Sequence, residues 1–119
     1  MGYKYLASPY TDPDYGVMYK RFVDICRVAG HLIGKGHHLF VPIAMSHPLQ
    51  EIGGAPHTWD FWQSFDTMML EKADELWVVK LEGWDTSVGV LAEIEIAKKA
   101  KLPIKYVDQH TGEIYDQAE

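Results

Sequence analysis

The chain has 119 residues, which is enough for one domain with its own core and too few for a second. Seventeen Asp and Glu residues outnumber eleven Lys and Arg residues, giving a formal net charge of −6, so we expect no basic surface for duplex nucleic acid. The single cysteine, Cys26, excludes an intrachain disulfide and any Cys-x-x-Cys motif. No apolar stretch approaches the roughly 18 residues of a membrane span, and the N-terminal residues do not resemble a signal peptide. We therefore expect a cytoplasmic protein that does not associate with membranes.

In the first half of the chain, the pattern predicts two strands separated by a long helix. The first strand covers Tyr3–Ala7, and the helix starts after Asp12–Asp14. Apolar residues recur at helical spacing until the helix ends at Gly34–Gly36. A second strand is predicted over His38–Pro42, followed by a loop from Ile43 to about His57. Loops of this length are often functional in a small domain.

In the second half, strands and helices continue to alternate. A helix capped by Thr58 or Asp60 runs to about Ala73 and precedes a strand over Glu75–Leu81 that looks buried on both faces. The next helix runs from about Ser87 to Ala100. The chain then closes with a strand at Leu102–Val107 and a short final strand at Glu113–Tyr115.

This alternation predicts one α/β domain over residues 1–119. We expect a three-layer sandwich of the flavodoxin or Rossmann-like kind, with a mostly parallel sheet of about four or five strands. In such sheets, ligands bind beyond the carboxyl ends of the strands. The candidate site is therefore expected around Ser8–Tyr10, the predicted loop, Leu81–Trp84 and the helix start at Ser87.

Two acidic residues lie where apolar residues are expected. A helical wheel places Glu93 in the middle of the apolar side of the helix that starts at Ser87. Asp66 occupies the same position on the preceding helix. Its neighbours on that face are Trp59, Trp62, Leu70 and Ala73. Because an unpaired buried carboxylate costs several kcal/mol, each acid needs hydrogen-bonding partners, a cavity or an oligomer interface.

The segment around Glu93 resembles a known family. Asp85–Ala97 contains S-x-G-x-x-x-E-x-x-x-A, which resembles the glutamate-bearing helix of nucleoside 2-deoxyribosyltransferases and, more closely, of the related 2'-deoxynucleoside 5'-monophosphate N-glycosidases. The opening Tyr5–Tyr10 is similar to the Y-[FL]-[AC]-G-[SP] strand end of that superfamily. Asp66 matches the position of its catalytic aspartate. The family's glycine after the first strand is replaced by Ser8, and the segment Met45–Leu49 resembles an uncharacterised bacterial and phage branch.

The resemblance implies an enzyme that cleaves the bond between base and sugar in a nucleoside or its 5'-monophosphate. Glu93 would be the nucleophile, Asp66 would protonate the departing base, and Tyr5 would hydrogen-bond and orient Glu93. The apolar surroundings predicted for Asp66 would raise its pKa, as a general acid requires.

The remaining residues assigned to substrate binding are Ser8, Pro9, Tyr10, His47, Trp62, Trp84, Ser87 and Gly89. Ser87 is expected to cap its helix, and by resemblance it would also bind a 5'-phosphate together with the backbone at Gly89. One of Trp62, Trp84 and Tyr10 would stack on the base, although a Trp in a small core more often only packs. His47 would form a polar wall of the pocket or lie in the loop without a role.

No metal or other cofactor is expected. His37 and His38 point to opposite faces of a strand, and His47, His57 and Asp60 lack the spacing of a recognisable ligand triplet.

Other functions are compatible with parts of the pattern. A dinucleotide-dependent oxidoreductase is excluded because Ser8–Tyr10 stands where G-x-G-x-x-G would be needed. A non-catalytic module that binds or sequesters nucleotides in the same pocket stays open. So does an interaction subunit in which both acids are structural. Members of the superfamily that the chain resembles assemble as dimers or larger oligomers, so the resemblance also implies a homo-oligomer, a dimer or tetramer. The aromatic-rich helix near residues 58–73 is expected to form its interface.

Overall fold

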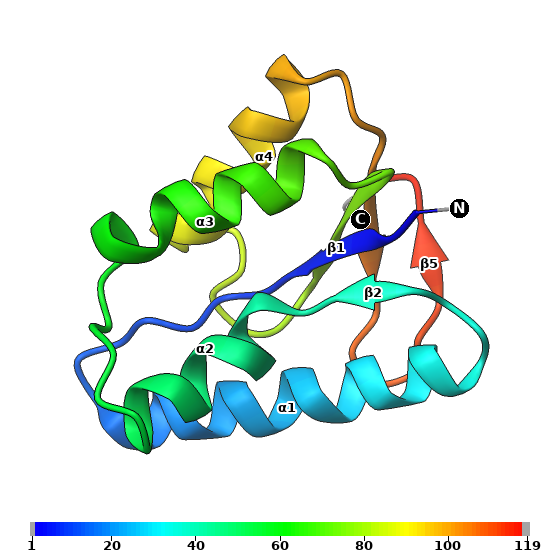
Figure 1. The fold of residues 1–119 in the computed structure, drawn as a ribbon. Coiled ribbons are helices and arrows are strands. Elements are labelled where there is room, and N and C mark those ends of the chain that lie inside the picture. The colour runs from blue at the N-terminus through cyan, green and yellow to red at the C-terminus, as the bar shows by residue number, and fades with distance from the viewer. Residues whose placement is uncertain (1, 118–119) are drawn as a thin grey trace.

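A five-stranded sheet forms the middle layer of the computed structural model, which describes residues 2–117 (Figure 1). The strand order is β2-β1-β3-β4-β5, with parallel pairing between all neighbours except the antiparallel pair β4 and β5. The strands are β1 (Lys4–Ala7), β2 (Leu39–Phe40), β3 (Glu75–Val79), β4 (Ile104–Val107) and β5 (Ile114–Tyr115). The predicted mostly parallel α/β sheet is confirmed.

Helices cover both faces of this sheet. They are α1 (Tyr15–Gly34), α2 (Pro42–Glu51), α3 (Trp59–Glu71) and α4 (Val88–Lys99). In Figure 1, α1 and α2 lie below the sheet and α3 and α4 above it. The three-layer sandwich is therefore confirmed. In the part of the chain from residue 2 to residue 117, no helix is long and apolar enough to cross a membrane.

Alternate residues of the central strands face opposite layers, as strand geometry requires. Leu6 of β1 and Val79 of β3 join the cluster under α1, while Tyr5 and Val78 join the cluster under α3 and α4. Both strands are buried on both faces, which explains the continuous apolar run that predicted β3. Tyr5 is the polar member of this pattern, and it points toward α4.

Three of the helices begin at residues whose side chains cap them. The Asp14 carboxylate accepts a hydrogen bond from the Gly16 amide at the start of α1. Thr58 accepts one from Phe61 at the start of α3, and Ser87 one from Val90 at the start of α4, at 3.3 and 3.2 Å. These starts agree with the sequence prediction.

The predicted loop from Ile43 to about His57 is wrong over most of its length, because residues Pro42–Glu51 form α2. The sequence features that normally predict a helix are weak in this segment. Val41 at the N-cap makes no side-chain cap hydrogen bond, and Pro48 lies inside the helix. The buried face of α2 mixes apolar and polar residues, so no clear apolar stripe marks it. The early start of α2 also shortens β2 relative to the predicted strand at His38–Pro42.

Candidate functional site

The main cavity, of about 520 Å³, opens beyond the carboxyl ends of β1 and β3. The strand order reverses between these two strands, because β2 follows on one side and β4 on the other. This is the position where open α/β sheets bind ligands. The predicted site residues that line the cavity are Ser8, Tyr10, Trp62, Asp66, Ser87, Gly89 and Glu93.

Glu93 is a buried residue of the cavity lining, and Tyr5, which does not line the cavity, forms a hydrogen bond with it. The Tyr5 hydroxyl donates a hydrogen bond of 2.5 Å to Glu93 Oε2, and only 6% of Glu93 is exposed. Burial raises the pKa of Glu93 to about 8, with the hydrogen bond from Tyr5 lowering it and the charge of Asp66 raising it further. Burial likewise raises the pKa of Tyr5, so that the phenol keeps the proton it donates.

Asp66 reaches the same cavity from α3 and is partly exposed. Burial raises the pKa of Asp66 to about 6, which is the direction expected from the apolar face on which it lies. The two carboxyl groups titrate as an interacting pair. Near pH 7, between about 6 and about 8, the pair therefore holds one proton and one negative charge.

The part of the cavity wall at the start of α4 can accept an anion. Ser87 and Gly89 line it at the N-terminus of α4, where backbone N–H groups carry partial positive charge. Arg21 of α1 lines the same cavity. This placement adds a full positive charge to a cavity whose other charged groups are carboxylates.

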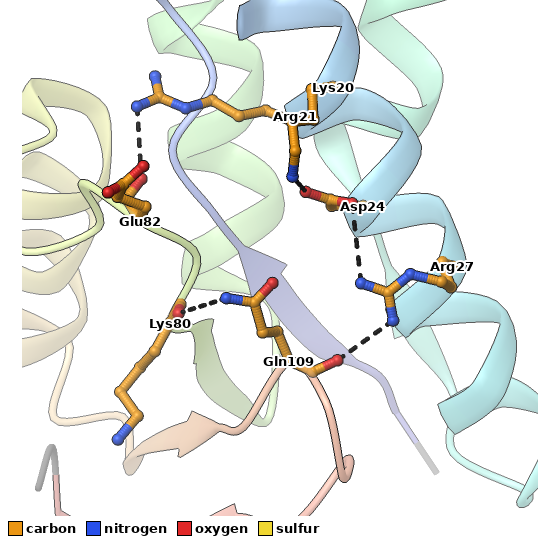
Figure 2. Close-up of polar contacts among 7 residues, drawn as sticks. All are labelled: Lys20, Arg21, Asp24, Arg27, Lys80, Glu82 and Gln109. Carbon is orange, nitrogen blue, oxygen red and sulfur yellow. Dashed lines mark hydrogen bonds and ion pairs between the residues drawn. The ribbon is translucent and has the colours of Figure 1, made fainter.

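Backbone carbonyl groups hold Arg21 in place. Its guanidinium donates to the carbonyl of Thr11 at 3.2 Å and to that of Glu82 at 3.3 Å, the second contact being drawn in Figure 2. Gly83 leaves room for it: a side-chain carbon there would lie 2.8 Å from an Arg21 nitrogen, and the backbone φ of +90° also favours glycine. The sequence analysis missed Arg21, because a basic residue beside Lys20 on a helix is normally a surface charge.

Some predicted site residues lie outside the main cavity. Pro9 is buried directly after β1 but does not line it. The ring of Trp84 packs against Tyr106, with 5.5 Å between ring centroids, in the core under α4. His47 is buried in α2 and lines a second cavity of about 360 Å³.

Several other residues missed by the sequence analysis line the main cavity. Ser46 and Gln50 come from α2, and they were missed because that segment was predicted to be a loop. Trp59, at the start of α3, adds a second indole beside Trp62. Among residues 2–117, no group of three or more His, Cys, Asp and Glu side chains is arranged to hold a metal ion.

Comparison with known proteins identifies a family for nearly the whole chain. The model of the family described as "Domain of unknown function (DUF1937)" matches residues 2–109, which include both carboxylates and all the cavity residues named above. No curated protein matches the chain.

Proposed function

The chain belongs to the family described as a domain of unknown function (DUF1937), and from its cavity we propose that it is an N-glycosidase or deoxyribosyltransferase. The substrate is a (deoxy)nucleoside or its 5'-monophosphate, and the bond that breaks joins the base to C1' of the sugar. The observation that carries this proposal is a buried glutamate, oriented by a tyrosine, that shares one cavity with a second carboxyl group of raised pKa.

The reaction needs one ionised and one protonated carboxyl group. As the C1'–N bond breaks, its electron pair leaves with the base, which takes a proton from Asp66. A Glu93 oxygen then forms an ester with C1'. Water, or a second base, then attacks C1' and transfers its proton to the Asp66 carboxylate. The ester bond between C1' and Glu93 breaks, and Glu93 leaves as a carboxylate. Both residues return to their starting protonation states.

Glu93 and Asp66 have different protonation states in the free enzyme and in the reaction. The higher pKa of Glu93 places the shared proton mainly on that residue. Moving it to Asp66 costs about 3 kcal/mol, the difference between pKa values of about 8 and about 6. Positive charge that develops on C1' beside Glu93 favours the ionised form of that residue and offsets this cost. The arrangement thus stabilises the transition state more than the free enzyme.

The rest of the cavity fits the two ends of such a substrate. The indoles of Trp59 and Trp62 offer aromatic surface for a base. Arg21, Ser87 and the N-terminus of α4 offer donors and positive charge for a 5'-phosphate. These features support a monophosphate as the preferred substrate.

The resemblance also implies a homo-oligomer, and exposed apolar side chains on two helices support this part of the proposal. They are Phe61 and Met68 of α3 and Val88 and Leu91 of α4. A monomeric mass in solution would contradict it.

A chromatographic screen for free base tests the proposal. The protein is incubated near pH 7, between the pKa values of the two carboxyl groups, with deoxynucleosides, ribonucleosides and their 5'-monophosphates, with and without an acceptor base. We expect release of free base, or base exchange, from at least one substrate class. Ligand-dependent stabilisation without base release would instead support a non-catalytic nucleotide-binding module.

Replacing Arg21 with Gln is expected to lower kcat/KM for a 5'-monophosphate by about 10–100-fold, and for the free nucleoside far less, because only the monophosphate loses a charge-assisted contact. Arg27→Gln is the matched control. Arg27 lies on the same helix and contacts Asp24 and the Gln109 carbonyl, outside the cavity lining (Figure 2). Equal losses for both substrates in Arg21→Gln would show that Arg21 only holds the backbone of Thr11 and Glu82.

A further inference from the structure

We propose that the hydroxyl of Tyr10, held by the buried His47 with the half-exposed Glu51 behind it, is a hydrogen-bond acceptor in the main cavity that selects bases with an exocyclic amino group. This inference rests on the proposed function, because it takes the ligand to be a nucleoside or nucleotide. Tyr10 is the specificity-determining residue here, and His47 and Glu51 are positioning residues.

A chain of short polar contacts connects Glu51 to the cavity. Glu51 Oε2 lies 2.6 Å from His47 Nε2, one turn away on α2. The other ring nitrogen, His47 Nδ1, lies 2.6 Å from the hydroxyl oxygen of Tyr10. Tyr10 lines both the main cavity and the second cavity, as do Gln50 and His57, so these three residues lie between the two.

The surroundings of His47 fix its position. Its imidazole is 2% exposed and stacks on Phe22, with 4.0 Å between ring centroids and 17° between planes. The rings of Tyr15 and Tyr19 lie 6.3 and 6.0 Å away. A histidine enclosed in this way cannot turn freely, so Nδ1 stays beside the Tyr10 hydroxyl and Nε2 stays beside the Glu51 carboxylate.

The charge of Glu51 decides the direction of the hydrogen bond between Tyr10 and His47. The carboxylate oxygen lies 2.6 Å from Nε2, outside hydrogen-bond geometry, and its negative charge favours the tautomer of His47 that carries its hydrogen on Nε2. Nδ1 then has a lone pair and accepts from the Tyr10 hydroxyl. Burial and the charge of Glu51 raise the pKa of Tyr10, which keeps the phenol protonated and able to donate. With its hydrogen used in this way, the Tyr10 oxygen has only lone pairs left for a ligand.

A second hydrogen-bond acceptor lies beside the Tyr10 hydroxyl. Gln50 Oε1 is 3.4 Å from the Tyr10 hydroxyl oxygen, and Gln50 also lines the main cavity. Two neighbouring oxygen acceptors match an amino group, which has two N–H donors. A carbonyl at the same place would leave acceptors facing each other and unpaired, which costs more than the loss of one hydrogen bond. The geometry therefore favours the 4-amino group of cytosine or the 6-amino group of adenine over the carbonyl of uracil or hypoxanthine.

Two substrate pairs test this selection, dCMP against dUMP and dAMP against dIMP. For wild type we expect at least one pair to show a preference of about 10–100-fold for the amino base, measured as the ratio of kcat/KM and as the ratio of Kd. Tyr10→Phe should bring this ratio close to one. Glu51→Ala changes a half-exposed side chain outside the main cavity. It should reduce the ratio several-fold, because His47 is then free to carry its hydrogen on Nδ1.

Tyr19→Phe is the matched control, since it removes the hydroxyl of another ring near His47 that does not line the main cavity. Its ratio should equal that of wild type. A wild-type ratio near one for both pairs would overturn the inference. A Tyr10→Phe variant that loses activity equally on both members of a pair would also do so, since a purely structural role affects both alike.

Binding and turnover separate this inference from the proposed function. If calorimetry shows the amino preference but no base is released, the selection stands and the glycosidase proposal fails. If base is released without an amino preference, the glycosidase proposal stands and the selection fails. If none of the four nucleotides binds, the selection is overturned together with the substrate class on which it rests.

Discussion

Replacing Glu93 with Gln is expected to abolish base release, with a loss of at least about 10⁴-fold in kcat, as is typical when the nucleophile of a catalytic unit is removed. Gln has nearly the same shape and can still accept the hydrogen bond from Tyr5, so the cavity should keep its form. It cannot, however, form the ester with C1' or stabilise positive charge there. Base release is measured by chromatography under the conditions that give turnover in wild type.

Glu95→Gln is the matched control for this experiment. Glu95 lies on the same helix but faces solvent and pairs with Lys98 at 3.5 Å. The same chemical change there should leave turnover within about twofold of wild type, because such surface pairs contribute little. Turnover that survives in Glu93→Gln would rule out this residue as the nucleophile.

Glu93→Gln is also expected to stabilise the protein at alkaline pH, by on the order of 2–4 kcal/mol in the free energy of unfolding at pH 8. The pKa of Glu93 is about 8 in the folded protein against an ordinary value of 4.5. Below pH 4.5 the carboxyl is protonated in both states and carries no penalty. As the pH rises from 4.5 to about 8, the unfolded state ionises first, so stability is progressively lost. Gln does not ionise and escapes this loss.

Urea denaturation at pH 4 and pH 8 measures this effect. The stability difference between Glu93→Gln and wild type should be near zero at pH 4 and largest at pH 8. Glu95→Gln should stay within about 0.5 kcal/mol of wild type at both pH values. A difference that is the same at both pH values would mean that ionisation of a buried Glu93 is not its source. Loss of turnover together with gain of stability is the expected signature of a residue retained for function.

The position of Glu93 and Asp66 could be predicted because helical periodicity alone decides it. Each acid lies among apolar residues at helical spacing, so packing of that face had to bring it inward. The structure places both in the cavity at the ends of β1 and β3, as the parallel arrangement of the strands required. Tyr5 also followed from local pattern, since alternation along β1 turns it toward α4.

Side chains whose surroundings come from distant segments could not be predicted. Arg21 looks like a surface charge until Gly83, far along the chain, folds beside it. Trp84 follows a strand and looks available to a ligand, yet it packs on Tyr106 of β4. The contact between Tyr10 and His47 spans 37 residues and depends on a helix that the sequence analysis had missed.

The sequence by itself thus determined the α/β architecture, the capped starts of three helices and the two acids on apolar faces. These features depend on residues within a few positions of one another, whose spacing, capping chemistry and polarity are local properties. Only the tertiary structure decided that Pro42–Glu51 is a helix, which side chains enclose the cavity and which way their hydrogen bonds point. A weakly patterned helix is stabilised by the surfaces it packs against rather than by its own sequence, and a cavity exists only once several distant segments have met.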